Sequence, residues 1–186
     1  GNMSDHKIAA IQLDTIACEV NHNVHKAMHW TRDAFEQGAN YVFLHEGLTA
    51  DYTPDPVRYG RALDSTEVYG FVTLAKRYDG YVALGLNELY EGRPYITMVW
   101  CGPEGVIGAY RKSYLWPHVD DLDEWLTEYQ PLKEGYRCER GFIAPGGGTT
   151  VMQVGDLRIG CIICADGWDA RAWDTFGEGG ADLIFW

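Results

Sequence analysis

Short apolar segments alternate with amphipathic segments along most of this chain, and this alternation limits the fold more than any other feature. The segment 21–38 has helical periodicity, with Asn21 as a candidate N-terminal cap and Gly38 at its end. The expected strands are 7–14, 41–45, 81–89, 95–101, 106–112, 150–155, 157–164 and 181–186, and the other expected helices are 67–80 and 169–180. Strand–helix–strand units mixed with hairpins predict an α/β layered domain with mixed sheets.

The composition indicates a globular protein with a strong negative charge. The chain has 186 residues, 46% of them hydrophobic and 13% aromatic, which suffices for one domain with a core. Its formal net charge of −12 argues against a nucleic acid or a membrane as partner, since either would need a basic face. We expect one domain over residues 7–186, with residues 1–6 a disordered N-terminus or the remnant of a tag.

Three reactive side chains occupy equivalent positions. Glu46, Lys112 and Cys164 each stand at or directly after the carboxyl end of an expected strand. Ligands of open α/β sheets bind beyond these strand ends, so the three side chains are expected to converge. A thiol needs a base to become a nucleophile, and a lysine can stabilise the oxyanion that forms at an attacked carbonyl. The three residue types together therefore suggest acyl transfer.

The cysteines allow other interpretations. Five cysteines, an odd number in a chain too large to need disulfides, indicate a reducing, cytoplasmic location. Cys161 and Cys164 could be buried filler, or a redox or metal pair. A redox pair needs its first cysteine at a helix start, whereas Cys161 lies in an expected strand, and zinc needs a second such pair. His22, His25 and His29 share a helix face without a neighbouring carboxylate or cysteine, so we expect no metal.

Several sequence blocks resemble those of the nitrilase superfamily of carbon–nitrogen hydrolases. In the family's order, the blocks are GANYVFLHEGLTADY (38–52), GAYRKSYL (108–115), RIGCIICADG (158–167) and GGADLIFW (179–186). The resemblance implies that Glu46 is the general base, Lys112 the catalytic lysine and Cys164 the nucleophile. The segment ERGFIAPGG (139–147) resembles the one with the family's second glutamate, which implies Glu139 as a fourth catalytic residue.

The resemblance also implies a fold and a mechanism. The fold is a nitrilase-like αββα sandwich that forms homodimers or larger homo-oligomers. Cys164 would attack a small amide or carbamoyl compound, and Lys112 and the backbone N–H of Ala165 would hold the oxyanion. Water would then hydrolyse the thioester, with no metal or organic cofactor. The aspartate two residues after the cysteine resembles the amidase and carbamoyl-hydrolase branches, which favours an amide over a nitrile.

The chain departs from the family pattern at several positions. His45 stands where the family usually has proline, and Arg171 and Asp174 stand where it usually has Glu and Arg. The helical spacing of Arg171 and Asp174 predicts an ion pair. The family domain continues beyond this chain, so we expect an incomplete domain with exposed apolar surface and weak turnover. The alternatives are a non-catalytic assembly module or inactive fragment, and a Cys161/Cys164 redox or metal protein.

Overall fold

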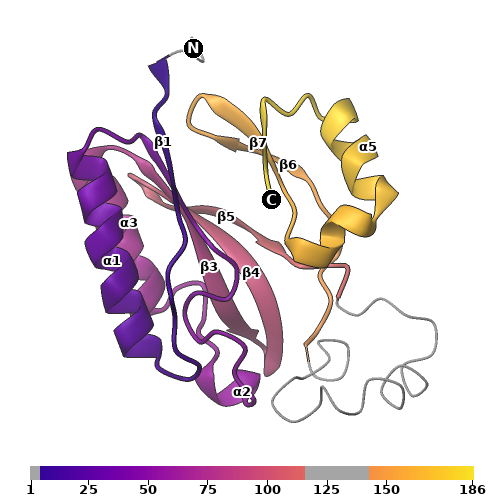
Figure 1. Cartoon of the computed structure of the whole chain (residues 1–186). Helices are drawn as coiled ribbons and strands as arrows, with labels where there is room; N and C mark the ends of the chain where they lie inside the picture. Colours follow the sequence, from indigo (N-terminus) through magenta and orange to yellow (C-terminus); the bar gives the residue numbers. More distant parts are fainter. Residues whose placement is uncertain (1–4, 116–142) are drawn as a thin grey trace.

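Two β-sheets lie face to face between helices in the computed structural model, which describes residues 5–115 and 143–186 (Figure 1). The strands are β1 (Ile8–Ile11), β2 (Tyr41–Leu44), β3 (Tyr81–Tyr90), β4 (Arg93–Gly102), β5 (Gly105–Arg111), β6 (Val151–Val154), β7 (Leu157–Cys161) and β8 (Leu183–Phe185). The helices are α1 (Val20–Glu36), α2 (Pro56–Tyr59), α3 (Thr66–Tyr78), the 3₁₀ helix η4 (Cys164–Trp168) and α5 (Ala170–Glu178). Within the described ranges, no helix has both the length and the apolar character to cross a membrane.

Both sheets combine parallel and antiparallel pairs, as the alternation of segments predicted. The first sheet has the order β1-β2-β3-β4-β5, with β1, β2 and β3 parallel and β4 and β5 added as antiparallel neighbours. The second sheet has the order β6-β7-β8, in which β6 and β7 form a hairpin and β8 is parallel to β7. The helices α1, α3 and α5 lie in the connections between parallel strands, where crossovers are required.

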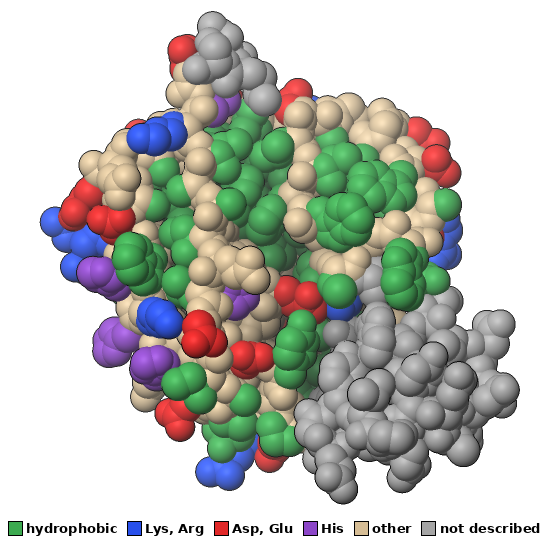
Figure 2. All heavy atoms as spheres, viewed as in Figure 1, with side chains coloured by type: hydrophobic (Ala, Val, Ile, Leu, Met, Phe, Trp, Pro, Cys, Tyr) green, Lys and Arg blue, Asp and Glu red, His purple; other side chains and the backbone are tan. Residues whose placement is uncertain are grey.

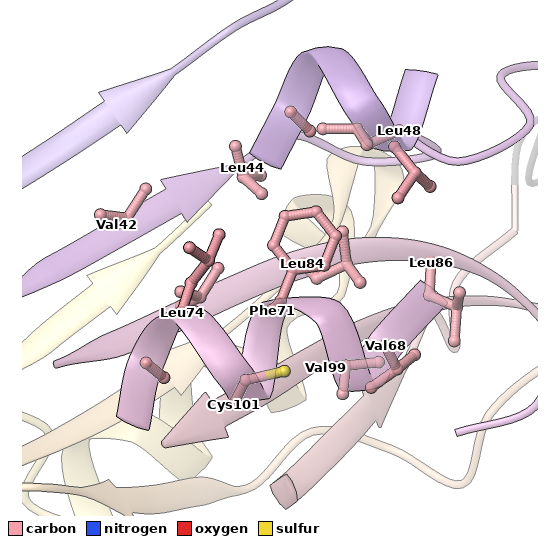
Figure 3. Packing of buried hydrophobic residues seen from close by; sticks show 14 of the residues in the cluster. Val42, Leu44, Leu48, Val68, Phe71, Leu74, Leu84, Leu86, Val99 and Cys101 are labelled. Atoms are coloured by element: carbon pink, nitrogen blue, oxygen red, sulfur yellow. The ribbon is translucent and has the colours of Figure 1, made fainter. Parts of the chain in front are cut away.

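Helices α1 and α3 cover one face of the first sheet (Figure 1). The side chains labelled in Figure 3 come from α3, from β2 and the segment that follows it, and from β3 and β4. Phe71 of α3, Leu44 of β2 and Leu84 of β3 are fully buried in this cluster. Burying a side chain of this size stabilises the fold by about 1.5–3 kcal/mol, so the helices and the sheet form one unit.

The opposite face of the first sheet packs against the second sheet. Along β2, Val42 and Leu44 face the helices while Tyr41 and Phe43 face the second sheet, in the two-residue period of a strand. The Phe43 ring lies 4.6 Å, centroid to centroid, from Phe185 of β8. Both faces of the first sheet are therefore covered, which explains the continuous apolar run of β2.

Helix α5 covers the outer face of the second sheet. Its Ala172 and Phe176 pack with Ile162. Gly160 of β7 makes room for the aromatic ring, because a Cβ there would lie 2.5 Å from Phe176. The layers run helix, sheet, sheet, helix, and this confirms the αββα sandwich implied by the resemblance.

The start of α1 differs from the sequence prediction. The helix begins at Val20, so Asn21 lies inside it and is not its cap. Asn23 holds the helix start instead, because its buried side chain accepts from the Ile16 N–H at 2.9 Å and donates to the carbonyls of Ile16 and Thr49. These contacts involve residues outside the helix, so the periodic pattern of the helix itself does not predict them.

The end of β7 also differs from the prediction. The strand stops at Cys161 and not at Cys164, although the Ile162 N–H still donates to the Phe185 carbonyl at 3.0 Å. The chain then turns at Cys164 into η4, which the sequence did not predict, and α2 was not predicted either. Apolar residues continue through the turn because both sheets bury them, so hydrophobicity alone does not locate the strand end.

Candidate active site

Residues that follow two of the strands line one pocket, and a residue that follows a third strand contacts one of them. Glu46 follows β2, Lys112 follows β5 and Cys164 follows β7. The Lys112 Nζ atom lies 3.0 Å from Glu46 Oε1, and Glu46 and Cys164 line the same pocket of about 480 Å³. The structure therefore brings together three residues that are far apart in the chain.

Apolar side chains form much of the pocket wall. They come from both sheets and the segments that follow them: Phe43, Met98, Ile162, Ile163, Phe185 and Trp186. Figure 2 shows hydrophobic side chains gathered between β1 and the second sheet, and residues of both regions line the pocket. A wall of this kind suits a small uncharged ligand and strengthens electrostatic interactions at the pocket.

Lys112 is fully buried, which proteins tolerate only when the charge has partners. The Glu46 carboxylate is one such partner, and the Glu46 side chain is only 17% exposed. The backbone of Lys112 is held on both sides: its N–H donates to the Ile96 carbonyl at 2.7 Å, and its carbonyl accepts from the Gly146 N–H at 2.9 Å. The ammonium group therefore has a defined position at the pocket.

The backbone before Glu46 lies against Gly85 of β3. A Cβ at Gly85 would lie 1.8 Å from the His45 carbonyl oxygen and 3.1 Å from the Glu46 Cα, so only glycine permits this approach. The Gly85 carbonyl accepts from the Leu48 N–H at 2.9 Å. The position of Glu46 therefore depends on one glycine of the neighbouring strand.

Cys164 opens η4 with a left-handed backbone conformation, at a φ of 45°. The preceding Ile163 is extended, with a φ of −122°, so the chain direction changes sharply at the cysteine. Residues other than glycine seldom adopt a positive φ, and those that do are concentrated at functional sites. The turn separates the exposed Cys164 from the buried Ile163 and places it at the pocket.

Asp166 ties the turn at Cys164 to the segment around Lys112. The buried carboxylate accepts hydrogen bonds from the N–H groups of Ile163 (2.9 Å), Ser113 (3.1 Å) and Tyr114 (2.7 Å) and from the Tyr110 hydroxyl (2.5 Å). Burial, together with this hydrogen bond, raises the pKa of Tyr110 far above its ordinary value, so its hydroxyl stays a donor. The sequence analysis used this aspartate only as a sign of the substrate branch and missed its positioning role.

Replacing Asp166 by asparagine should lower both stability and turnover. All four contacts are donors, whereas an amide side chain offers one acceptor oxygen and a donor NH₂ group. We expect a loss of about 2–4 kcal/mol in the free energy of unfolding and a fall of roughly tenfold to a hundredfold in kcat. Urea unfolding and ammonia release measure the two effects, with Asp156→Asn, at an exposed turn, as the control. Unchanged stability would contradict the positioning role.

Cys161 and Cys164 lie in different environments. Cys161 is 3% exposed among the residues between the sheets, and burial raises the pKa of its thiol. Cys164, in contrast, is exposed. The described part of the chain holds no group of three or more His, Cys, Asp or Glu side chains arranged to bind a metal ion. The contrast in burial does not favour a redox pair.

Iodoacetamide should label Cys164 well before Cys161 and Cys101. Only a thiolate reacts at an appreciable rate, so labelling at about pH 8 reports ionisation and access together. Burial raises the pKa of Cys101 to about 12, and it raises the pKa of Cys161 as well. Both buried thiols should become reactive only in urea. A time course followed by peptide mass spectrometry tests this, and labelling of Cys161 ahead of Cys164 would contradict it.

Arg171 pairs with Asp169 and not with Asp174, so the ion pair expected from helical spacing is wrong. The Arg171 Nη2 atom lies 2.8 Å from Asp169 Oδ2, and the Arg171 N–H also donates to this carboxylate, which caps α5. Helical side chains lean toward the N-terminus of their helix, which favours the earlier partner. Of the other expected site residues, Ala165 follows Cys164 in η4, and Glu139 lies outside the described residues.

The four-layer fold is the one that the sequence resemblance implied, and Glu46 and Cys164 line one pocket in it. The chain belongs to the carbon–nitrogen hydrolase family, whose family model matches residues 7–186, and thus to the nitrilase superfamily.

Individual relatives include a nitrilase and two amidases. The chain is 28% identical over 184 residues to a nitrilase of Pyrococcus abyssi, covering 96% of this chain and 63% of that protein. It is 28% identical over 188 residues to the human omega-amidase, covering 98% and 63%. An amidase of Nesterenkonia sp. AN1 shares the fold, with a TM-score of 0.74 and 16% identity over 97% of this chain and 63% of that one. The chain thus spans just under two thirds of the length of these relatives.

Proposed function

We propose that this chain carries the catalytic centre of a hydrolase that cleaves the non-peptide carbon–nitrogen bond of small amides or carbamoyl compounds. The observation that carries the proposal is the Glu46–Lys112 pair, 3.0 Å apart, at the pocket that Cys164 lines. A base, a cation and an accessible thiol are the groups that acyl transfer through a thioester requires. The relatives named above, a nitrilase and an omega-amidase, support the reaction class.

In the first half of the reaction, the Cys164 thiol gives its proton to Glu46 as its sulfur attacks the amide carbon. The new C–S bond leaves an oxyanion, which the Lys112 ammonium and the Ala165 N–H stabilise. Collapse of this intermediate breaks the C–N bond, and the proton held by Glu46 passes to the departing nitrogen. The products of this half are ammonia, or an amine, and an acyl thioester on Cys164.

In the second half, water replaces the amine. Glu46 accepts a proton from the water, whose oxygen attacks the thioester carbon, and Lys112 again stabilises the oxyanion. Breaking the C–S bond releases the carboxylic acid, and the proton returns to the Cys164 sulfur. Glu139 is the proposed fourth catalytic residue, on the strength of the resemblance alone. No step uses a metal or an organic cofactor.

We propose an amide as substrate in preference to a nitrile. The relatives include proteins named for each activity, so they do not distinguish the two. The aspartate at position 166 resembles the amidase and carbamoyl-hydrolase branches, which favours an amide, and the apolar pocket wall suits a small uncharged ligand. From the family resemblance we also propose homodimers or larger homo-oligomers, and from the odd number of cysteines a cytoplasmic location.

Ammonia release from propionamide and from a carbamoyl amino acid tests the proposal directly. The 186-residue chain, which spans just under two thirds of the length of its relatives, should release ammonia slowly, and a rapid acid quench should trap a propionyl group on the peptide that carries Cys164. Cys164→Ala should abolish both signals. The matched control is Cys161→Ala, three residues earlier and buried, which should retain turnover. An inert chain with Cys164 intact would favour the non-catalytic assembly module.

A further inference from the structure

His45 holds a buried nitrogen without a hydrogen-bond partner at the candidate active site. In the described part of the chain, three buried side-chain polar atoms lack a partner: His6 Nε2, Thr31 Oγ1 and His45 Nε2. Of these three residues, only His45 lines the pocket that Glu46 and Cys164 also line. Leaving a buried polar atom unsatisfied costs about 1–3 kcal/mol, so such an atom at a ligand pocket points to a group that the ligand supplies.

The hydrogen bond at the other ring nitrogen indicates what kind of group is missing. His45 Nδ1 lies 2.9 Å from the Glu46 carbonyl oxygen. A carbonyl oxygen can only accept, so Nδ1 carries the proton, and in the neutral ring Nε2 is then an acceptor with a free lone pair. The complement of this nitrogen is an N–H or O–H donor.

The backbone holds the ring on the pocket side of the sheet. Phe43 faces the second sheet, and the two-residue alternation continued past β2 puts His45 on the same side. Both residues line the pocket. The His45 carbonyl is also packed closely against Gly85, so the ring has little freedom to move with its backbone.

We propose that His45 Nε2 accepts a hydrogen bond from the N–H of the substrate's amide group and so selects amides over nitriles. The inference rests on the proposed function. A primary amide presents N–H donors on the nitrogen that leaves, whereas a nitrile nitrogen is only an acceptor and would face the lone pair of the ring. Because His45 and Glu46 line the same pocket, an amide nitrogen held by the ring lies in the pocket of the residue that we propose protonates it on departure.

Binding measurements separate this role from catalysis. In a Cys164→Ala background, which prevents turnover, we would measure dissociation constants by ligand-observed NMR for propionamide, N,N-dimethylpropionamide, propionitrile and propionate. Replacing His45 by phenylalanine keeps a ring and removes the acceptor. Affinity for propionamide should fall by about tenfold, while affinities for the nitrile and the dimethylamide, which lack N–H groups, should change less than twofold. His45→Gln, which restores an acceptor oxygen, should recover part of the affinity for propionamide.

Three results would overturn the proposal. Equal loss of affinity for the amide and the nitrile would make His45 a packing residue. An unchanged propionamide affinity would show that no hydrogen bond forms. Tighter binding of propionate than of propionamide would show a protonated ring that donates. Ammonia release by the chain with His45 and Cys164 intact is a separate measurement, so this inference can fail while the proposed hydrolase stands, and an inert chain would be recognised as failure of the hydrolase.

Discussion

Replacing Glu46 by glutamine should lower amide turnover by roughly 10²–10⁴-fold, the contribution of a positioned general base, with little change in substrate affinity. Glutamine keeps the shape of the side chain but cannot accept the proton of Cys164. The substitution also removes the carboxylate 3.0 Å from the buried ammonium of Lys112, so we expect a loss of about 3–5 kcal/mol in the free energy of unfolding.

A second substitution separates the two effects of Glu46→Gln. Adding Lys112→Met removes the buried charge, so the double variant should regain part of the stability but none of the turnover. Glu67→Gln is the matched control, because Glu67 also pairs with a basic residue, Arg61, at 3.0 Å but does not line the pocket. Steady-state ammonia release and urea unfolding measure both quantities. Turnover of Glu46→Gln within a few fold of the unsubstituted chain would remove Glu46 as the base.

Replacing Gly85 by alanine should destabilise the protein and abolish turnover, although it changes none of the proposed reactive groups. The new Cβ would lie 1.8 Å from the His45 carbonyl oxygen, so β3 and the backbone before Glu46 must separate. Overpacking of a core costs about 1–3 kcal/mol, and a clash with the backbone of His45 and Glu46 lies at or beyond the upper end.

The control for Gly85→Ala is the same substitution in helix α5. Gly177 has no atom within 4 Å of a built Cβ, and it lies inside the helix. Gly177→Ala should therefore raise the free energy of unfolding by about 0.5–1 kcal/mol and leave turnover unchanged. If urea unfolding showed that Gly85→Ala has the same stability as the unsubstituted chain, the close approach of Gly85 to the backbone of His45 would be contradicted.

The approach of Glu46, Lys112 and Cys164 to one another could be predicted because each comes after a strand of the alternating pattern, although the end of β7 itself could not be located from the sequence. The positioning roles of Gly85, against the backbone before Glu46, and of Asp166, at the turn of Cys164, could not be predicted. Asp166 accepts from Tyr110 and Tyr114, which precede it by 56 and 52 residues, so its partners depend on how β5 and β7 are placed in three dimensions.

The sequence patterns by themselves determined an α/β layered domain with mixed sheets and the chemistry available at the strand ends, and the family resemblance added the order of the four layers. The two-residue and helical periods of hydrophobic residues are properties of neighbouring positions in the sequence, so they can be recognised without knowledge of the fold. Only the tertiary structure decided which groups meet: Lys112 with Glu46, Arg171 with Asp169, and the Nε2 atom of His45 with no partner in the described part of the chain. The reason is physical, since a hydrogen bond or an ion pair depends on atoms a few ångströms apart, and the packing of distant segments sets those distances.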